Sequence, residues 1–171
     1  KNNTLFSPGA FNPFRFIDDF TITPQKIEFG RQLFFEKQLS ANNKQSCAGC
    51  HQPNKAFTDG LKTSDALDGH SVLNRNAPTL WNAALQRNLF ADSRSRSLED
   101  QVLQVLNNSK EMHGSAKAVA EKVLNNEKYL DLFSIKKEKA FMLNVNYILT
   151  LVAVLCLELI KALIQNQWQV L

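Results

Sequence analysis

The sequence predicts an all-α domain in which long loops join the helices. Apolar residues recur at helical spacing behind residues that favour helix N-termini, and no run of alternating apolar and polar residues predicts a β-strand. The chain has 171 residues, which is enough for one domain with a sizeable core. No internal repeat, low-complexity tract or linker divides the sequence.

The first helix is predicted near residues 24–37. Thr23 provides an N-cap, and Pro24 occupies the first helical position, where a missing N–H leaves no hydrogen bond unmade. The residues that follow repeat at helical spacing: Ile27, Gly30, Leu33 and Phe34. After this helix, proline and glycine residues predict a long loop over residues 52–75, and long loops in compact domains are often functional.

Three further helices are predicted in the second half of the chain. Ser97 begins a sequence that resembles a capping box, and Ser115 can cap the next helix. Their apolar faces are Leu98, Val102, Val105 and Leu106 in one helix and Ala116, Val119, Ala120 and Val123 in the other. The fourth helix is predicted within residues 140–164. Its apolar run at 147–157 is too short to cross a bilayer, so we expect a core helix and no membrane-spanning segment.

The charge of the chain is modest and evenly spread. The formal charge is +4 at pH 7, and the lysines and arginines are scattered among acidic residues. Nucleic-acid binders usually carry a clustered basic surface, so we expect no nucleic-acid partner. The chain begins at Lys1 without an apolar leader, and we interpret it as a processed, mature product.

One pentapeptide points to a specific chemistry: Cys47-Ala48-Gly49-Cys50-His51. A C-x-x-C-H sequence is the attachment motif of a c-type haem. Its spacing puts both sulfurs on one side of a helical turn, where they can bond to the two vinyl groups of the porphyrin, and aims the histidine at the iron. We therefore predict one covalently bound haem c, attached through Cys47 and Cys50 and ligated by His51.

Two other interpretations of this motif compete, a redox dithiol and half of a zinc site. A redox C-x-x-C is expected near a βαβ pattern, which we do not find. A zinc site needs four ligands, and the only other cysteine, Cys156, lies far away in an apolar segment. We interpret Cys156 as a small buried apolar group. The cysteine count then allows at most one c-type haem.

Several strings around the motif together resemble the bacterial di-haem cytochrome c peroxidase and MauG family. They are Gly30–Phe35, Leu39–Ser40, Ser46–His51, Ala56–Gly60, Arg75–Leu80, Leu98–Gln101 and Glu111–Met112. The resemblance matches the family's amino-terminal, peroxidatic haem domain. It implies a cytochrome c-like helical domain around the haem over residues 24–165, with an N-terminal extension over 1–23 and a C-terminal tail over 166–171.

The resemblance also implies roles for particular residues. His51 matches the proximal iron ligand, while Gln101 and Glu111 match two polar residues of the peroxide pocket. A carboxylate there can take a proton from one peroxide oxygen and return it to the other, and a glutamine can hold the peroxide without adding charge. Without the resemblance, Glu111 would be interpreted as a helix-dipole partner and Gln101 as a solvent-facing residue.

The sixth iron ligand has two candidates. His70 lies in the loop that matches one from which, in many members of the family, a histidine ligates the resting iron. Met112 follows His51 at a separation typical of the axial methionine in small mono-haem cytochromes c. We expect His113 to be exposed.

Three departures from the family pattern bear on function. Ala91 stands where many members have an aromatic residue between the two haems, and Val105 stands where members often have proline. The chain also stops where the family's second domain, with its own C-x-x-C-H motif, would begin.

The sequence thus predicts a periplasmic c-type haem protein. The first hypothesis is a peroxidatic module that reduces hydrogen peroxide to water with electrons from another haem, carried by a second domain, a subunit or a soluble cytochrome. The alternative is a mono-haem electron-transfer protein, or a haem-bearing subunit of a larger complex, without peroxidase activity. Ala91 and the missing second domain favour the alternative, whereas Gln101 and Glu111 favour the enzyme.

Overall fold

The computed structural model of the protein describes residues 24–81, 83, 86–127 and 129. These residues form four α-helices: α1 (Pro24–Phe35), α2 (Cys47–Cys50), α3 (Leu98–Asn107) and α4 (Ala116–Leu124). Two short 3-10 helices accompany them, η1 (Lys37–Leu39) and η2 (Pro53–Lys55). Among the described residues there are isolated β-bridges but no strand, as the sequence predicted.

The expected helix starts are present where the chain is described. The hydroxyl of Ser97 accepts from the backbone N–H of Asp100 at 3.1 Å, and that of Ser115 accepts from Ala118 at 3.0 Å. Each hydroxyl satisfies one of the backbone donors that a helix N-terminus leaves unpaired. The helix predicted within 140–164 lies outside the described residues, as do the ends of the predicted domain.

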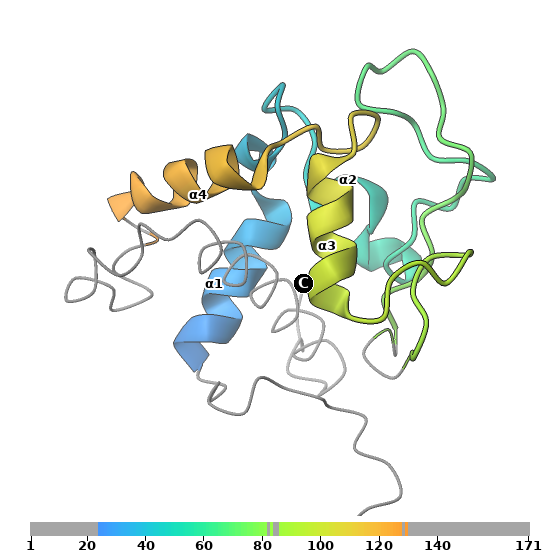
Figure 1. The fold of residues 1–171 in the computed structure, drawn as a ribbon, viewed down its shortest axis with the longest axis horizontal. Coiled ribbons are helices and arrows are strands. Elements are labelled where there is room, and N and C mark those ends of the chain that lie inside the picture. Colours follow the sequence, from blue (N-terminus) through green and yellow to red (C-terminus); the bar gives the residue numbers. More distant parts are fainter. Residues whose placement is uncertain (1–23, 82, 84–85, 128, 130–171) are drawn as a thin grey trace, which may run out of the picture.

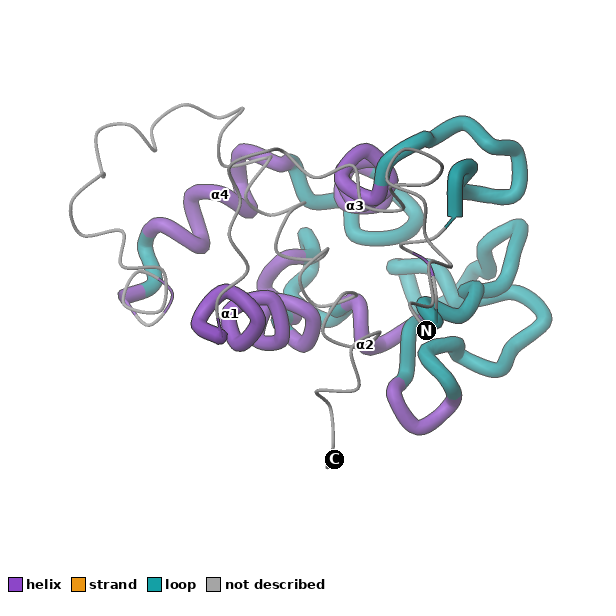
Figure 2. The backbone as a smooth tube through the Cα atoms, turned by 90° about the horizontal axis from the view of Figure 1, so that it is seen from below, coloured by secondary structure: helices purple, strands orange, loops and turns teal. Residues whose placement is uncertain are grey.

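The helices form two layers around one principal core. Figure 2 shows α1 and α2 in one layer and α3 with α4 in the other. The core residues between them come from α1, η1, α3, α4 and the segments that follow α3 and α4: Phe29, Leu33, Leu39, Leu106, Met112, Val119, Val123 and Tyr129. The long connection from η2 to α3 lies to one side of the helices, away from α4 (Figures 1 and 2).

Three polar contacts fix α4 and the segment after α3 to η1 and the residues that follow it. The ammonium group of Lys122 donates to the carbonyl oxygen of Gln38 and, at 3.1 Å, to Asn43 Oδ1. The backbone N–H of Ala41 donates to the carbonyl of Met112 at 2.9 Å. These contacts hold the residues that follow α3 in a set position relative to the first layer.

Within the described residues, none of the helices combines the length and apolar character that crossing a bilayer requires.

Candidate haem-binding site

The two cysteines of the pentapeptide lie on one helical turn. Cys47 begins α2 and Cys50 ends it, and the N–H of His51 donates to the carbonyl of Cys47 at 2.8 Å. Residues spaced in this way face the same side of a helix. Both cysteine side chains are partly buried. The turn therefore presents two sulfurs and the following imidazole as one unit.

Gln45 supports this turn from the preceding loop. Its side-chain amide donates to Cys50 Sγ at 3.0 Å, and a Cβ added at Gly49 would lie 3.1 Å from its Oε1 atom. Burial raises the pKa of the Cys50 thiol to about 11, against the lowering effect of the Gln45 contact. The negative charges of Asp59 and Glu111 raise it further. The thiol of Cys50 is thus protonated at neutral pH.

His51 is oriented by a backbone carbonyl. Its Nδ1 atom lies 3.0 Å from the carbonyl oxygen of Phe57. Because a carbonyl only accepts, Nδ1 carries the proton and Nε2 keeps its lone pair for a metal. Burial lowers the pKa of His51, although the carbonyls of Phe57 and Pro78 oppose this shift. The neutral imidazole is the form that binds iron.

A strained loop supplies that carbonyl. Ala56 and Phe57 both adopt left-handed backbone conformations, with φ of 53° and 58°. The loop is closed by hydrogen bonds from Gln52 N to Thr58 O at 3.0 Å and from Phe57 N to Gln52 O at 2.9 Å. A non-glycine residue in this region costs on the order of 1–3 kcal/mol, and such residues cluster at functional sites. Here the strain turns the Phe57 carbonyl toward His51.

A second loop braces the first. Thr79 Oγ1 donates to the carbonyl of Ala56 at 2.6 Å. The carbonyl of Pro78, from the same loop as Thr79, raises the pKa of His51. The strings Ala56–Gly60 and Arg75–Leu80, separate in the sequence, therefore meet around the histidine. No pattern in the sequence identifies Phe57 and Thr79 as site residues, because only the fold brings their loops together.

These groups fit a c-type haem. The turn provides two thiols on one face and an imidazole whose free nitrogen is Nε2. The hydrogen bond from Nδ1 to the Phe57 carbonyl is of the kind that fixes the ring orientation of a metal-bound histidine. Among the described residues, no three or more His, Cys, Asp or Glu side chains form a group that could hold a metal ion.

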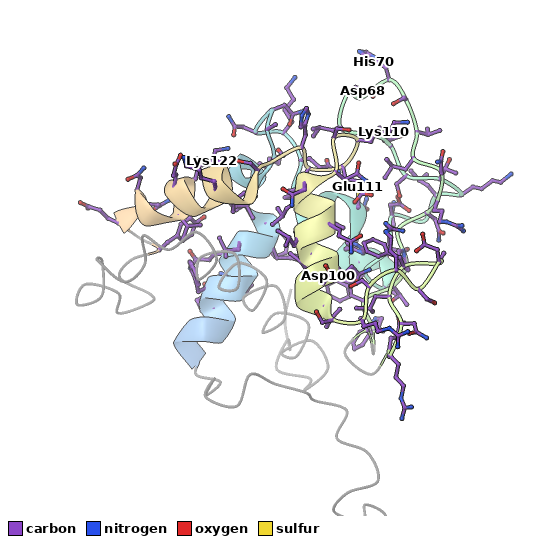
Figure 3. All side chains as sticks on the ribbon, viewed as in Figure 1. Asp68, His70, Asp100, Lys110, Glu111 and Lys122 are labelled. Atoms are coloured by element: carbon purple, nitrogen blue, oxygen red, sulfur yellow. The ribbon has the colours of Figure 1, made fainter. Side chains whose placement is uncertain are left out.

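Glu111 lies in the turn that follows α3. It is half-buried, and its Oε1 accepts from Asn108 Nδ2 at 2.9 Å. Burial raises the pKa of Glu111, while the positive charge of Arg94 and the Asn108 hydrogen bond lower it. Since its charge also raises the pKa of Cys50, this carboxyl group lies within electrostatic range of α2. Figure 3 shows Glu111 beyond the end of α3, on the side of α2.

Arg94 is a further charged group on this side of α3. Its guanidinium pairs with Asp92 at 2.9 Å, donates to Gln104 at 3.0 Å and stacks on the Phe90 ring at 3.4 Å. No pattern in the sequence indicates a site role for Arg94. These three contacts hold its positive charge in place, within electrostatic range of Glu111.

Gln101 occupies the first turn of α3 and is partly buried. Glu111 follows the opposite end of the same helix, and Figure 3 shows this separation through the labels of Asp100 and Glu111. The helix spans about 15 Å at the standard rise per residue. Gln101 therefore lies within α3 and Glu111 in the turn that follows it, and their roles in a peroxide pocket stay predictions.

The two candidate sixth ligands lie in different surroundings. His70 is exposed near the tip of the long loop, where its N–H donates to Asp68 Oδ1 at 2.9 Å (Figure 3). Met112 is only 3% exposed and packs in the principal core. Both assignments stay predictions.

Comparison with known proteins places the chain among haem proteins. The family model described as di-haem cytochrome c peroxidase matches residues 24–155. Cytochrome c551 peroxidase from Pseudomonas aeruginosa is 33% identical over 112 residues, which covers 66% of this chain and 32% of that protein. The MauG protein of Methylorubrum extorquens, named for methylamine utilization, is 34% identical over 112 residues, covering 66% of this chain and 31% of that protein. This chain thus spans about a third of the length of these curated relatives.

Solved structures share the fold. A MauG-like protein associated with microbial copper homeostasis superimposes with a TM-score of 0.72 at 25% identity, over 100% of this chain and 52% of that one. The diheme peroxidase BthA from Burkholderia thailandensis gives a TM-score of 0.70 at 22% identity, over 83% of this chain and 39% of that one. The fold of this chain is therefore found as part of larger proteins.

Proposed function

The chain belongs to the di-haem cytochrome c peroxidase family, and on this premise we propose that it is a periplasmic peroxidatic module with one covalent haem c. In this proposal it reduces hydrogen peroxide to water with electrons from another haem. The observation that supports the proposal most directly is the position of Glu111, a half-buried carboxyl group within electrostatic range of the haem-attachment turn. Cys47 and Cys50 would hold the haem and His51 its iron.

When bound, the haem supplies the redox centre at which peroxide takes up electrons. Glu111 removes a proton from one peroxide oxygen and delivers it to the other, so that the O–O bond breaks with water as the leaving group. Two electrons and two further protons complete the conversion of one peroxide to two waters. Gln101 donates a hydrogen bond to the peroxide and orients it for this transfer.

The surroundings of Glu111 and His51 set the protonation of the carboxyl group and the tautomer of the imidazole. Burial raises the pKa of Glu111, which brings a carboxyl group closer to the range in which it can both accept and release a proton. The Phe57 carbonyl keeps His51 in the tautomer that can ligate iron. The electrons come from a haem in a second domain, another subunit or a soluble cytochrome.

Rapid mixing of the reduced, haem-loaded chain with hydrogen peroxide tests the proposal, with a small artificial donor supplying electrons. Glu111→Gln should slow the reaction by about a hundredfold or more, the usual scale for loss of a general acid and base. Gln101→Leu should cause a smaller loss. Glu121→Gln is the matched control, because it removes the same charge from an exposed carboxylate on α4.

The alternative function, a mono-haem electron carrier, is favoured by the exposed Ala91 at a position where an aromatic residue is common in the family. If the unmutated chain reacts with peroxide no faster than the Glu111→Gln variant, this alternative replaces the peroxidase. Haem attachment is tested separately. Acid-acetone should leave haem on the unmutated polypeptide, whereas a chain with both Cys47→Ala and Cys50→Ala should retain none.

A further inference from the structure

Four aromatic rings form a continuous row from the end of α1 into the long connection after η2: Phe35, Phe34, Phe57 and Trp81. The centroid distances between successive rings are 5.3, 6.2 and 6.0 Å, and all three pairs meet edge to face. The two inner rings are buried, whereas both outer rings are exposed, Phe35 to 38% and Trp81 to 43%. Trp81 is the exposed ring that contacts Phe57 directly. The row therefore connects the surface to the interior near the haem-attachment turn.

Phe57 joins this row to the iron ligand. Its ring contacts the indole of Trp81, and its carbonyl oxygen lies 3.0 Å from Nδ1 of His51. A route from Trp81 to His51 thus crosses one ring contact, a short covalent stretch within Phe57 and one hydrogen bond. Electron tunnelling is favoured by covalent bonds and hydrogen bonds and decays steeply across gaps, so this route has a single weak step.

The position of Trp81 is set by the loop that braces the histidine. Its backbone N–H donates to Thr79 Oγ1 at 3.2 Å, and the same hydroxyl donates to the carbonyl of Ala56 at 2.6 Å. Ala56 directly precedes Phe57 in the strained loop. The surface end of the route and its link to His51 are therefore tied together through Thr79.

We propose that Trp81 is the point at which electrons enter this chain, and that they pass through Phe57 and His51 to the haem. This inference rests on the proposed haem function and adds the route of reduction to it. The electron source is a reduced c-type haem on another protein or domain. One electron leaves that haem, which becomes oxidised, and one electron reduces the haem held by His51; no bond forms or breaks.

The test measures reduction of the ferric, haem-loaded chain without peroxide. Reduced cytochrome c from a commercial preparation is mixed with the ferric chain in a stopped-flow instrument, and the rate is followed at rising donor concentration. Trp81→Leu should lower the limiting rate at saturating donor by about tenfold, equivalent to ~1.4 kcal/mol of activation free energy. Trp81→Phe should lose less, because a ring still contacts Phe57.

Two controls separate a path from a docking surface or a distorted site. Val72→Ala removes an exposed apolar side chain from the long loop and should leave the limiting rate unchanged. The midpoint potential of the haem should be the same in the Trp81→Leu variant as in the unmutated chain. An unchanged limiting rate, a rise confined to the half-saturating donor concentration, or a shifted potential would each overturn the proposal.

A double substitution checks that both aromatic residues belong to one route. Phe57→Leu keeps the carbonyl that orients His51 but removes the ring. If the route is shared, Trp81→Leu combined with Phe57→Leu should slow reduction little more than the slower single variant, whereas multiplied effects would indicate independent roles and refute the path.

The proposed peroxidase function can fail separately from this inference. If the unmutated chain does not reduce peroxide even with a small donor, the proposed function fails, yet the dependence of ferric reduction on Trp81 is still measured. If peroxide reduction with the small donor survives in Trp81→Leu and reduction by cytochrome c is also unchanged, only the electron route is refuted.

Discussion

Gly114 lies where the segment that carries Glu111 packs against η1, and this contact allows a quantitative test. A Cβ built on Gly114 would lie 2.6 Å from the carbonyl oxygen of Leu39 and 3.4 Å from a methyl group of Val119. The Leu39 oxygen is a backbone atom and cannot rotate away as a side chain can. Gly114 is also tied to α3, because its N–H donates to Leu106 O at 2.8 Å.

Gly114→Ala therefore forces a backbone shift in a packed region. Overpacking of this kind costs about 1–3 kcal/mol in the free energy of unfolding. In a chain of this size each kcal/mol lowers the melting temperature by about 2–4 °C. We expect the larger values, since both neighbours are held in the core. The same shift moves Glu111, so peroxide reduction should fall as well.

Urea titration of the haem-loaded chain measures this cost, because thioether bonds would keep the haem on the unfolded polypeptide. Gly69→Ala is the matched control. Gly69 has φ of 71° but no atom within 4 Å of the added Cβ, so its substitution carries conformational strain without overlap, about 1 kcal/mol. An unchanged urea midpoint in Gly114→Ala, or a smaller loss than in Gly69→Ala, would refute the packing argument.

Two further predictions concern the iron and the core. His70→Gly should convert a low-spin ferric spectrum to high-spin. Met112→Ala should leave the spectrum nearly unchanged but lower the free energy of unfolding by about 2–5 kcal/mol, because it truncates a core side chain. A spectrum that changes with Met112→Ala and not with His70→Gly would favour the electron carrier. Burial and a 2.5 Å hydrogen bond from its hydroxyl to Glu36 raise the pKa of Tyr129, so the stability this provides is complete below about pH 10 and is lost as pH rises toward the folded-state value. Tyr129→Phe should therefore flatten the alkaline fall in the urea midpoint, and equal pH profiles for the two proteins would contradict this.

The features that the sequence determined are local in the chain. Ser97 and Ser115 cap helices because their hydroxyls reach backbone N–H groups only three residues away. Cys47, Cys50 and His51 share one turn for the same reason. Short-range geometry of this kind depends on few dihedral angles, so residue type and spacing are enough to predict it.

Only the tertiary structure decided how the histidine is held and where the distal candidates lie. The Phe57 carbonyl reaches His51 because Ala56 and Phe57 both adopt left-handed conformations. An alanine and a phenylalanine do not predict that conformation. The path of the chain after α3 places the side chain of Met112 in the core, which its spacing from His51 does not specify. Contacts between distant segments depend on every loop between them, and the sequence pattern does not specify those paths.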